Sequence, residues 1–188
     1  QTALTAEPDD TDEFLVSDAG TIKRIDYSLI KGGNLSEADQ FRLSASISAG
    51  TNADITSNLE RIDTTGSPKV GTGMSESSGI FTFPSTGMYL INVNAVFSSN
   101  ANDAMYYVNT LITTDNSSYV DGAYAVSANQ DDGSTTNKSA SSSIMFDVTN
   151  TSTHKVKFAT VSMASGTGLD GNTNVNYTTF TFLRLGDT

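Results

Sequence analysis

The sequence predicts an all-β protein whose larger part is an antiparallel β-sandwich. Of its 188 residues, 37% are hydrophobic and only 16% are charged, so much of the polarity comes from Ser, Thr and Asn. Ser and Asn side chains compete with the hydrogen bonds of helices, and this composition therefore favours strands and loops. Segments in which every second residue is apolar recur from Phe41 onward, separated by turn-rich stretches.

These alternating segments place the expected strands. In three segments the apolar side chains lie on one face of the expected strand. They are Phe41, Leu43, Ala45, Ile47 and Ala49 in "FRLSASISA", Phe81 and Phe83 in "GIFTFPSTG", and Tyr89, Ile91, Val93, Ala95 and Phe97 in "MYLINVNAVFSS". Further strands are expected in "AYAVSA", "SSSIMFDV", "HKVKFATVSM" and "YTTFTFLRL". The total of about eight to ten strands is typical of a β-sandwich. We expect the last strand to lie centrally, beside the first.

Two segments depart from this simple alternation. Residues 104–113, "AMYYVNTLIT", are apolar on both faces, which predicts a strand buried on two sides. In "LSEADQF" Ser36 precedes Glu37 in a pattern that predicts one turn of helix.

The chain divides into an N-terminal arm, residues 1–38, and a body, residues 39–188. Within the arm, "EFLVSDAGTIKRID" predicts a hairpin with its turn at residues 18–20, and "KGG" predicts a flexible joint. A lone two-stranded hairpin is marginal in water, so its apolar surface needs a partner. That partner is the body itself, the arms of other protomers, or a different protein.

Charge and cysteine content exclude several classes of function. A formal net charge of −11 disfavours nucleic acid and anionic membranes as partners. The absence of cysteine excludes disulfides, thiolate metal sites and cysteine nucleophiles. No apolar run approaches the roughly 20 residues that span a bilayer, so no membrane insertion is expected.

Catalysis is not expected from these residues. The single histidine, His154, begins a strand and reads as an exposed strand-end residue rather than as the base of a Ser-His-Asp triad. Asp131 and Asp132 in "NQDDGS" read first as a turn, although a carboxylate pair for glycoside hydrolysis stays an alternative.

Metal binding is left open rather than predicted. Calcium prefers oxygen ligands, which the loop residues Asp115, Asp121, Asp131, Asp132 and Asp170 offer. None of these loops matches a known calcium motif, and solvated turn residues explain them as well. We therefore expect no cofactor, with calcium as a possibility.

The body resembles the trimeric jelly-roll superfamily of complement globular heads and tumour necrosis factor (TNF). In "SGIFTFPSTGMYLINVNAVF", Gly79, Phe81, Gly87 and Tyr89 match its G-x-F-x-x-x-x-x-G-x-Y pattern. "FRLSASIS" resembles its first strand and "YTTFTFLRL" its closing strand. The resemblance implies a jelly roll of about ten strands that assembles as a homotrimer. The chain departs from it in having no tryptophan and a surface rich in Ser, Thr and Asn.

The arm resembles a different group of proteins. "FLVSDAGTIKRIDYSLI" is similar to a "D-x-x-L-V-S-D-x-G-x-L-K-R" segment in structural and fibre proteins of marine tailed bacteriophages. The matching residues are Leu15, Val16, Ser17, Asp18, Gly20, Lys23 and Arg24. This resemblance implies a virion protein whose arm precedes a globular tip.

Together these readings predict a non-enzymatic homotrimer on the exterior of a phage particle, attached to other virion proteins through its arm. Its role is a fibre tip that contacts host-surface glycans; the alternatives are a capsid decoration protein and a glycan-degrading spike enzyme. The predicted anchor residues are Phe14, Leu15, Val16, Ile22, Lys23, Arg24, Ile25, Tyr27, Leu29 and Ile30. Candidates for the trimer interface are Tyr106, Val108, Ile112 and Tyr119, which the sequence assigns equally well to the sandwich core. The loops 98–104, 115–122, 129–139 and 165–176 are expected to contact the ligand, with Asp115, Asn116, Asp121, Asn129, Asp131, Asp132, Asp170 and Asn172 as the candidate residues.

Overall fold

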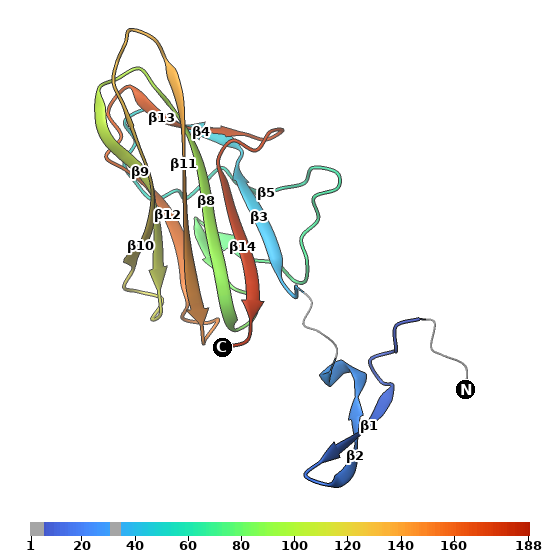
Figure 1. The fold of residues 1–188 in the computed structure, drawn as a ribbon. Helices are drawn as coiled ribbons and strands as arrows, with labels where there is room; N and C mark the ends of the chain where they lie inside the picture. Colours follow the sequence, from blue (N-terminus) through green and yellow to red (C-terminus); the bar gives the residue numbers. More distant parts are fainter. Residues whose placement is uncertain (1–5, 31–34) are drawn as a thin grey trace. The chain divides into compact units, whose positions relative to one another are not determined.

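The chain divides into two units, Gln1–Asn34 and Leu35–Thr188, in a computed structural model that describes residues 6–30 and 35–188 (Figure 1). The division lies a few residues before the boundary expected at residue 38. The joint expected at residues 31–33 lies outside the described residues.

The first unit contains a two-stranded antiparallel hairpin, β1 (Glu13–Asp18) and β2 (Thr21–Asp26), followed by a 3-10 turn, η1 (Tyr27–Leu29). Ala19 and Gly20 connect the strands with φ angles of 49° and 83°. Two consecutive residues with positive φ form the type I′ turn that matches the twist of a hairpin. The predicted hairpin and its turn are confirmed.

The second unit is a sandwich of two antiparallel sheets (Figure 1). The five-stranded sheet has the order β10-β9-β12-β7-β6, and the seven-stranded sheet has the order β4-β13-β8-β14-β3-β5, with β11 on the other side of β8. The strands are β3 (Ala38–Leu43), β4 (Ala45–Ile47), β5 (Leu59–Arg61), β6 (Ser75–Ser77), β7 (Ile80–Thr82), β8 (Gly87–Ser99), β9 (Asp103–Thr113), β10 (Val120–Asn129), β11 (Thr136–Val148), β12 (Lys155–Val161), β13 (Thr167–Asn172) and β14 (Thr179–Gly186). An all-β jelly roll is confirmed, with twelve strands between residues 35 and 188 rather than about ten.

Alternation builds the core between the sheets. In β8 the side chains predicted to point inward are all buried, from Tyr89 to Phe97. Phe81 of β7 lies at the centre of an aromatic cluster, with ring centroids 5.0 Å from Phe41, 5.6 Å from Phe158 and 5.1 Å from Phe182. Aromatic pairs at these separations add to the stabilisation that burial provides.

The C-terminal strand lies where the sequence placed it. β14 pairs with β8 on one side and with β3 on the other, which puts the last strand of the chain in the middle of the larger sheet.

Two local predictions are wrong. "LSEADQF" forms no helical turn, because Ala38 begins β3 and pairs with Leu183 of β14. "FRLSASISA" is not one strand, since a bend at Ser44 separates β3 from β4, which pairs with β13 instead of β14. As a result the side chains of Ala45 and Ala49 are exposed rather than inward-facing.

Within residues 6–30 and 35–188 no helix has the length and apolar character needed to cross a membrane.

Candidate ligand site

Three loops predicted to contact a ligand meet at one end of the sandwich. The pairing places Ser99, at the end of β8, opposite both Thr136 at the start of β11 and Thr167 at the start of β13. The loops before and after these residues border a hollow of ≈ 450 Å³. Its lining is Ser46, Ile47, Ser48, Ala49, Ser98, Asn100, Thr135, Ser165, Gly166, Gly168 and Asp170. We call this the end hollow.

The end hollow lies far from where the chain enters the body. β3 starts at Ala38, opposite Leu183, and Gly186 at the end of β14 lies opposite Met88 at the start of β8. β8 runs from that end to Ser99, so the whole length of the sandwich separates the entry point from the end hollow (Figure 1).

Hydrogen bonds fix the walls of the end hollow. The Ser98 hydroxyl donates to Asp170 Oδ1 at 2.9 Å, which links β8 to β13. Beneath them the buried hydroxyls of Ser99 and Thr167 lie 2.8 Å apart. The backbone N–H of Asn100 donates to the carbonyl of Gly166 at 3.1 Å. The polar groups are therefore held in place before any ligand arrives.

The chemistry of the end hollow suits an uncharged, hydroxyl-rich ligand. Most of its polar lining consists of Ser and Thr hydroxyls, and a hydroxyl both donates and accepts hydrogen bonds. Asp170 is the one carboxylate among its lining residues and disfavours anionic ligands. Hydrolysis of a glycosidic bond by the usual mechanism needs two carboxylates, and this lining supplies one.

Of the predicted ligand residues, only Asp170 lines the end hollow. Asp131 and Asp132 lie in the nearby turn, where they accept hydrogen bonds from the backbone N–H groups of Gly133 and Ser134 at 2.8 and 3.0 Å. Asn129 is buried and donates to the carbonyl of Ala101. These hydrogen bonds stabilise the loops beside the end hollow.

The other predicted ligand residues lie elsewhere. Asp115 and Asn116 occupy the turn between β9 and β10 at the opposite end, where the N–H groups of Ser117 and Ser118 hydrogen-bond to Asp115 and hold its pKa well below the usual range. Asp121 lies on β10, where hydrogen bonds from Tyr124 and Asn109 lower its pKa. Asn172 accepts from the N–H of Asn174 at the end of β13.

The trimer-interface prediction is wrong for three of its four residues. Tyr106 and Val108 are fully buried between the sheets, and Ile112 packs against the same core. The inward face of β9 is therefore not available to another protomer. Tyr119 is half-buried, and the ammonium group of Lys157 lies 4.4 Å from its ring centroid.

A different surface, which the sequence did not reveal, has the character of an interface. We call it the uncharged face: the outward residues of β11, β8, β14 and β3, which cross-strand pairing arranges in rows. These rows are Ser141–Asn94–Thr179–Arg42, Ser143–Asn92–Thr181–Gln40 and Met145–Leu90–Leu183–Ala38. Charged residues are depleted at the centres of protein interfaces. On β11, β8 and β14 these three rows hold none, and the one charged member, Arg42 on β3, is buried in ion pairs with Glu60 and Asp63.

The arm residues divide between the two faces of the hairpin. Phe14, Val16 and Ile25 share one face with the Lys23–Asp18 ion pair, and the ring of Tyr27 packs 6.0 Å from that of Phe14. Leu15 and Ile22 share the other face with the Arg24–Glu13 pair and are 76% and 65% exposed. Ile30 is also exposed, and the side chain of Leu29 lies outside the described residues. Both faces of the hairpin are thus apolar at the centre.

His154 is buried, not exposed as expected. Its ring stacks on Phe146 with centroids 5.6 Å apart, and its nitrogens lie 3.2 Å from Thr149 Oγ1 and 3.1 Å from Thr153 Oγ1. These contacts are structural. The described residues also bring no three His, Cys, Asp or Glu side chains together in a way that would hold a metal ion.

Known structures share the fold of the body. Eiger, a TNF protein from S. frugiperda, matches with a TM-score of 0.60 and 12% identity over 82% of this chain and 96% of that chain. Crystal structures of murine APRIL at pH 8.0 and pH 8.5 give TM-scores of 0.57 and 0.56, with 10% and 9% identity, over 79% of this chain and 98% of theirs. No family model matches the sequence, and no curated protein matches it.

At such low identities the likeness concerns the fold alone. The chain is an all-β protein whose body is a TNF-like jelly-roll sandwich. The resemblance of the body to that superfamily, predicted from its strand–turn–strand motif, is confirmed at the level of fold.

Proposed function

We propose that this chain is a non-enzymatic structural protein on the exterior of a tailed-bacteriophage particle. It forms a homotrimer of TNF-like jelly rolls, attaches to other virion proteins through its hairpin arm, and contacts host-surface glycans with the end hollow. The observation that carries this proposal is the position of the end hollow, a sandwich length away from the strand that follows the arm. Attachment and recognition are then served by opposite ends of the body.

The uncharged face supports the homotrimer. The body has the fold of TNF-like proteins, and on β11, β8 and β14 its larger sheet presents three rows of residues without a charge. Asn92 and Ser143 lie directly opposite each other in the middle row. Light scattering should give three times the mass of one chain for the wild-type protein and one chain mass for Asn92→Lys, because an unpaired charge is costly in a desolvated interface. The control is Ser77→Lys, on the exposed edge of the other sheet, which should stay trimeric.

Glycan contact is tested by electrophoresis through native gels that contain dextran or mannan. At least one of these neutral polysaccharides should slow the wild-type protein, and Asp170→Ala should move as in a gel without polysaccharide. Asp115→Ala removes a carboxylate at the other end of the body and should behave as wild type. Loss of retardation in Asp115→Ala but not in Asp170→Ala would place the site at the wrong end and refute the end hollow.

A hydrolytic role is the rival that these gels do not exclude. We propose that the protein releases no reducing sugar from the polysaccharide that slows it. Release that disappears in Asp131→Asn or Asp132→Asn would replace the structural role with that of a spike enzyme. We further propose that neither calcium nor another cofactor is required, so that EDTA leaves the Tm of the purified protein unchanged.

A decoration protein seated on the capsid is the second candidate. The hairpin supports a decoration protein as well as it supports a fibre tip, because the apolar side chains on both faces of the arm could be buried against the capsid shell or against the tail. A map of the particle decides between them: density at tail-proximal sites supports a fibre tip, and density at threefold positions of the capsid supports decoration.

A further inference from the structure

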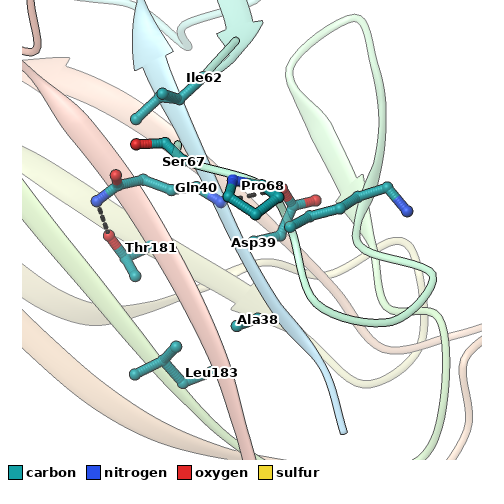
Figure 2. A pocket seen from close by; sticks show the side chains of 9 residues that line it. Ala38, Asp39, Gln40, Ile62, Ser67, Pro68, Thr181 and Leu183 are labelled. Carbon is teal, nitrogen blue, oxygen red and sulfur yellow. Dashed lines mark hydrogen bonds between the residues drawn. The ribbon is translucent and has the colours of Figure 1, made fainter. Parts of the chain in front are cut away.

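A hollow of ≈ 200 Å³ opens on the uncharged face beside β3 and β14 (Figure 2). The two strands supply two cross-strand pairs to it, Ala38 with Leu183 and Gln40 with Thr181. Gln40 Nε2 donates to Thr181 Oγ1 at 2.7 Å, so the polar groups of this pair satisfy each other. The remaining wall comes from Asp39 of β3 and from Ile62, Ser67, Pro68 and Lys69 in the segment 62–69. We call this the side hollow; its accessible surface is more apolar than polar.

The same face carries one prominent apolar side chain. Met145 of β11 is 65% exposed, although the outward residues before it on that strand, such as Ser141 and Ser143, are polar. A large apolar side chain held out of a polar strand loses the stabilisation that burial provides. Met145 therefore has the form expected of a residue that a partner covers.

Met145 and the side hollow lie at the same level of the sandwich. The register of the strands puts Met145 opposite Leu90, Leu90 opposite Leu183, and Leu183 opposite Ala38. Adjacent strands are about 4.8 Å apart, so about 14 Å separates Met145 from Ala38 along this row. Two strands, β8 and β14, lie between β11 and β3. The thioether of Met145 is thus too far away to fill the side hollow of its own chain.

We propose that Met145 of one protomer inserts into the side hollow of the next protomer in the trimer. A cyclic trimer is built from head-to-tail contacts, in which one patch meets a different patch on the neighbour. Rotation about an axis that runs along the strands keeps every residue at its own level. Two complementary features at the same level on one face can therefore meet in each of the three interfaces.

The chemistry of the two features also agrees. Leu183, Ala38, Ile62 and Pro68 offer an apolar lining, and an unbranched methionine side chain adapts to an irregular space more readily than a branched one. Met145 brings no charge into the interface. Two charged residues line the side hollow, and both have partners within the chain: the Asp39 carboxylate accepts from Arg61, and the Lys69 ammonium donates to the carbonyls of Gly71 and Thr72. This inference depends on the proposed homotrimer and names the contact that holds it together.

Cross-linking tests the contact directly, because the chain contains no cysteine. In the double variant Met145→Cys with Leu183→Cys each interface would hold one cysteine from each protomer. Oxidation should give covalent trimers on a non-reducing gel. Each single variant has one cysteine per chain and should give no species larger than a dimer. Trimers of the double variant that stay non-covalent under oxidation would refute the insertion.

Charge substitution gives a second, independent measurement. Met145→Asp should raise the concentration at which trimers dissociate at least tenfold, and combining Met145→Lys with Leu183→Asp should restore assembly relative to either single variant. Met145→Leu should assemble as wild type. The control is Met105→Asp. Met105 is 50% exposed on the other sheet, so this substitution should leave the trimer intact.

The outcomes separate this inference from the proposed function. A monomeric wild-type protein would refute the homotrimer and the inference together. A trimeric wild type whose folded Met145→Asp variant dissociates at the same concentration would refute the insertion and leave the homotrimer standing. Since Met145 is exposed in the single chain, its substitution should leave the urea midpoint of the monomer unchanged.

Discussion

At the scale of single residues, the buried charge of Arg42 is the least expected feature. Its position in an alternating strand predicts a polar side chain on the outer face, and it does point outward, yet it is only 1% exposed. Glu60 and Asp63 both form ion pairs with its Nη2, and Arg42 Nε also donates to Glu60 Oε1 at 3.0 Å. The periodicity predicts the direction of Arg42 but not its burial, because the acids that cover it are distant in the sequence: Glu60 lies opposite Arg42 on β5, and Asp63 follows that strand.

Replacing Arg42 tests how much this cluster contributes to the stability of the folded protein. Arg42→Met keeps most of the side-chain volume but leaves Glu60 without its cation, and the free energy of unfolding should fall by about 2–3 kcal/mol. Lys157→Met is the matched control: its ion pair with Asp54 is half-exposed, and the loss should be below ~1 kcal/mol. Urea denaturation monitored by circular dichroism measures both. Equal losses in the two variants would contradict the role assigned to burial.

The same cluster predicts a dependence of stability on pH. The hydrogen bond from Arg42, followed by that from Thr173, lowers the pKa of Glu60 in the folded protein. Unfolded glutamate has a pKa of about 4.3, so the unfolded chain binds the proton first as the pH falls. The stability from Glu60 is therefore complete above that pH and disappears as the pH falls through the lower folded value.

Urea midpoints between pH 6 and pH 3 give the measurement for Glu60. Glu60→Gln removes the titrating group, and its midpoint should fall less steeply with acid than that of the wild type. An identical acid slope in the two proteins would show that other carboxylates cause the loss.

At the scale of elements, tight turns explain which predictions from local sequence were right. The I′ turn at Ala19–Gly20 was predicted because Gly20 can adopt positive φ without strain, and such a signal is local. "LSEADQF" also has a local signal, for a helix, but partners distant in the sequence override it. The N–H of Arg184 donates to the carbonyl of Glu37, while the Asp39 carboxylate accepts from Arg61 and from the N–H of Met74.

Gly79 and Gly66 provide a matched pair of substitutions. Both have strongly positive φ, 83° and 88°, but a Cβ on Gly79 would lie 2.2 Å from the carbonyl oxygen of Ile55, whereas one on Gly66 would meet nothing within 4 Å. Gly66→Ala should cost about 1–2 kcal/mol from backbone strain alone. Gly79→Ala should cost clearly more, and urea denaturation should show the difference. Equal costs would mean that the loop before β5 yields freely.

At the scale of the whole molecule, the fold was more predictable than the site. Alternation in β8 and β14 identifies the inner faces, and the aromatic residues there make one core, so the sandwich follows from local patterns. The end hollow does not, because Ser46, Asn100 and Asp170 meet only through the pairing of distant strands. Loops 98–104, 129–139 and 165–176 were predicted to contact a ligand and do converge, but their most conspicuous acidic residues, Asp131 and Asp132, do not line the hollow.

Deletion of residues 1–33 tests the independence of the two units. Every buried apolar side chain of the core lies at or after Phe41, so the truncated protein should keep the urea midpoint and the trimer mass of the full chain. Under the proposed attachment through the hairpin, it should no longer join the phage particle. A truncated protein that unfolds would show instead that the arm completes the core.

The pairing of β3 with β14 affects how readily such a domain can be transferred between genes. The first and last strands of the body lie side by side, and Ala38 at the start of β3 lies opposite Leu183 near the end of β14 (Figure 1). A segment whose two ends are neighbours can be exchanged between genes as a cassette, because a host protein has to accommodate only one point of attachment. Recombination could thus join this sandwich to a different N-terminal segment without disturbing its core.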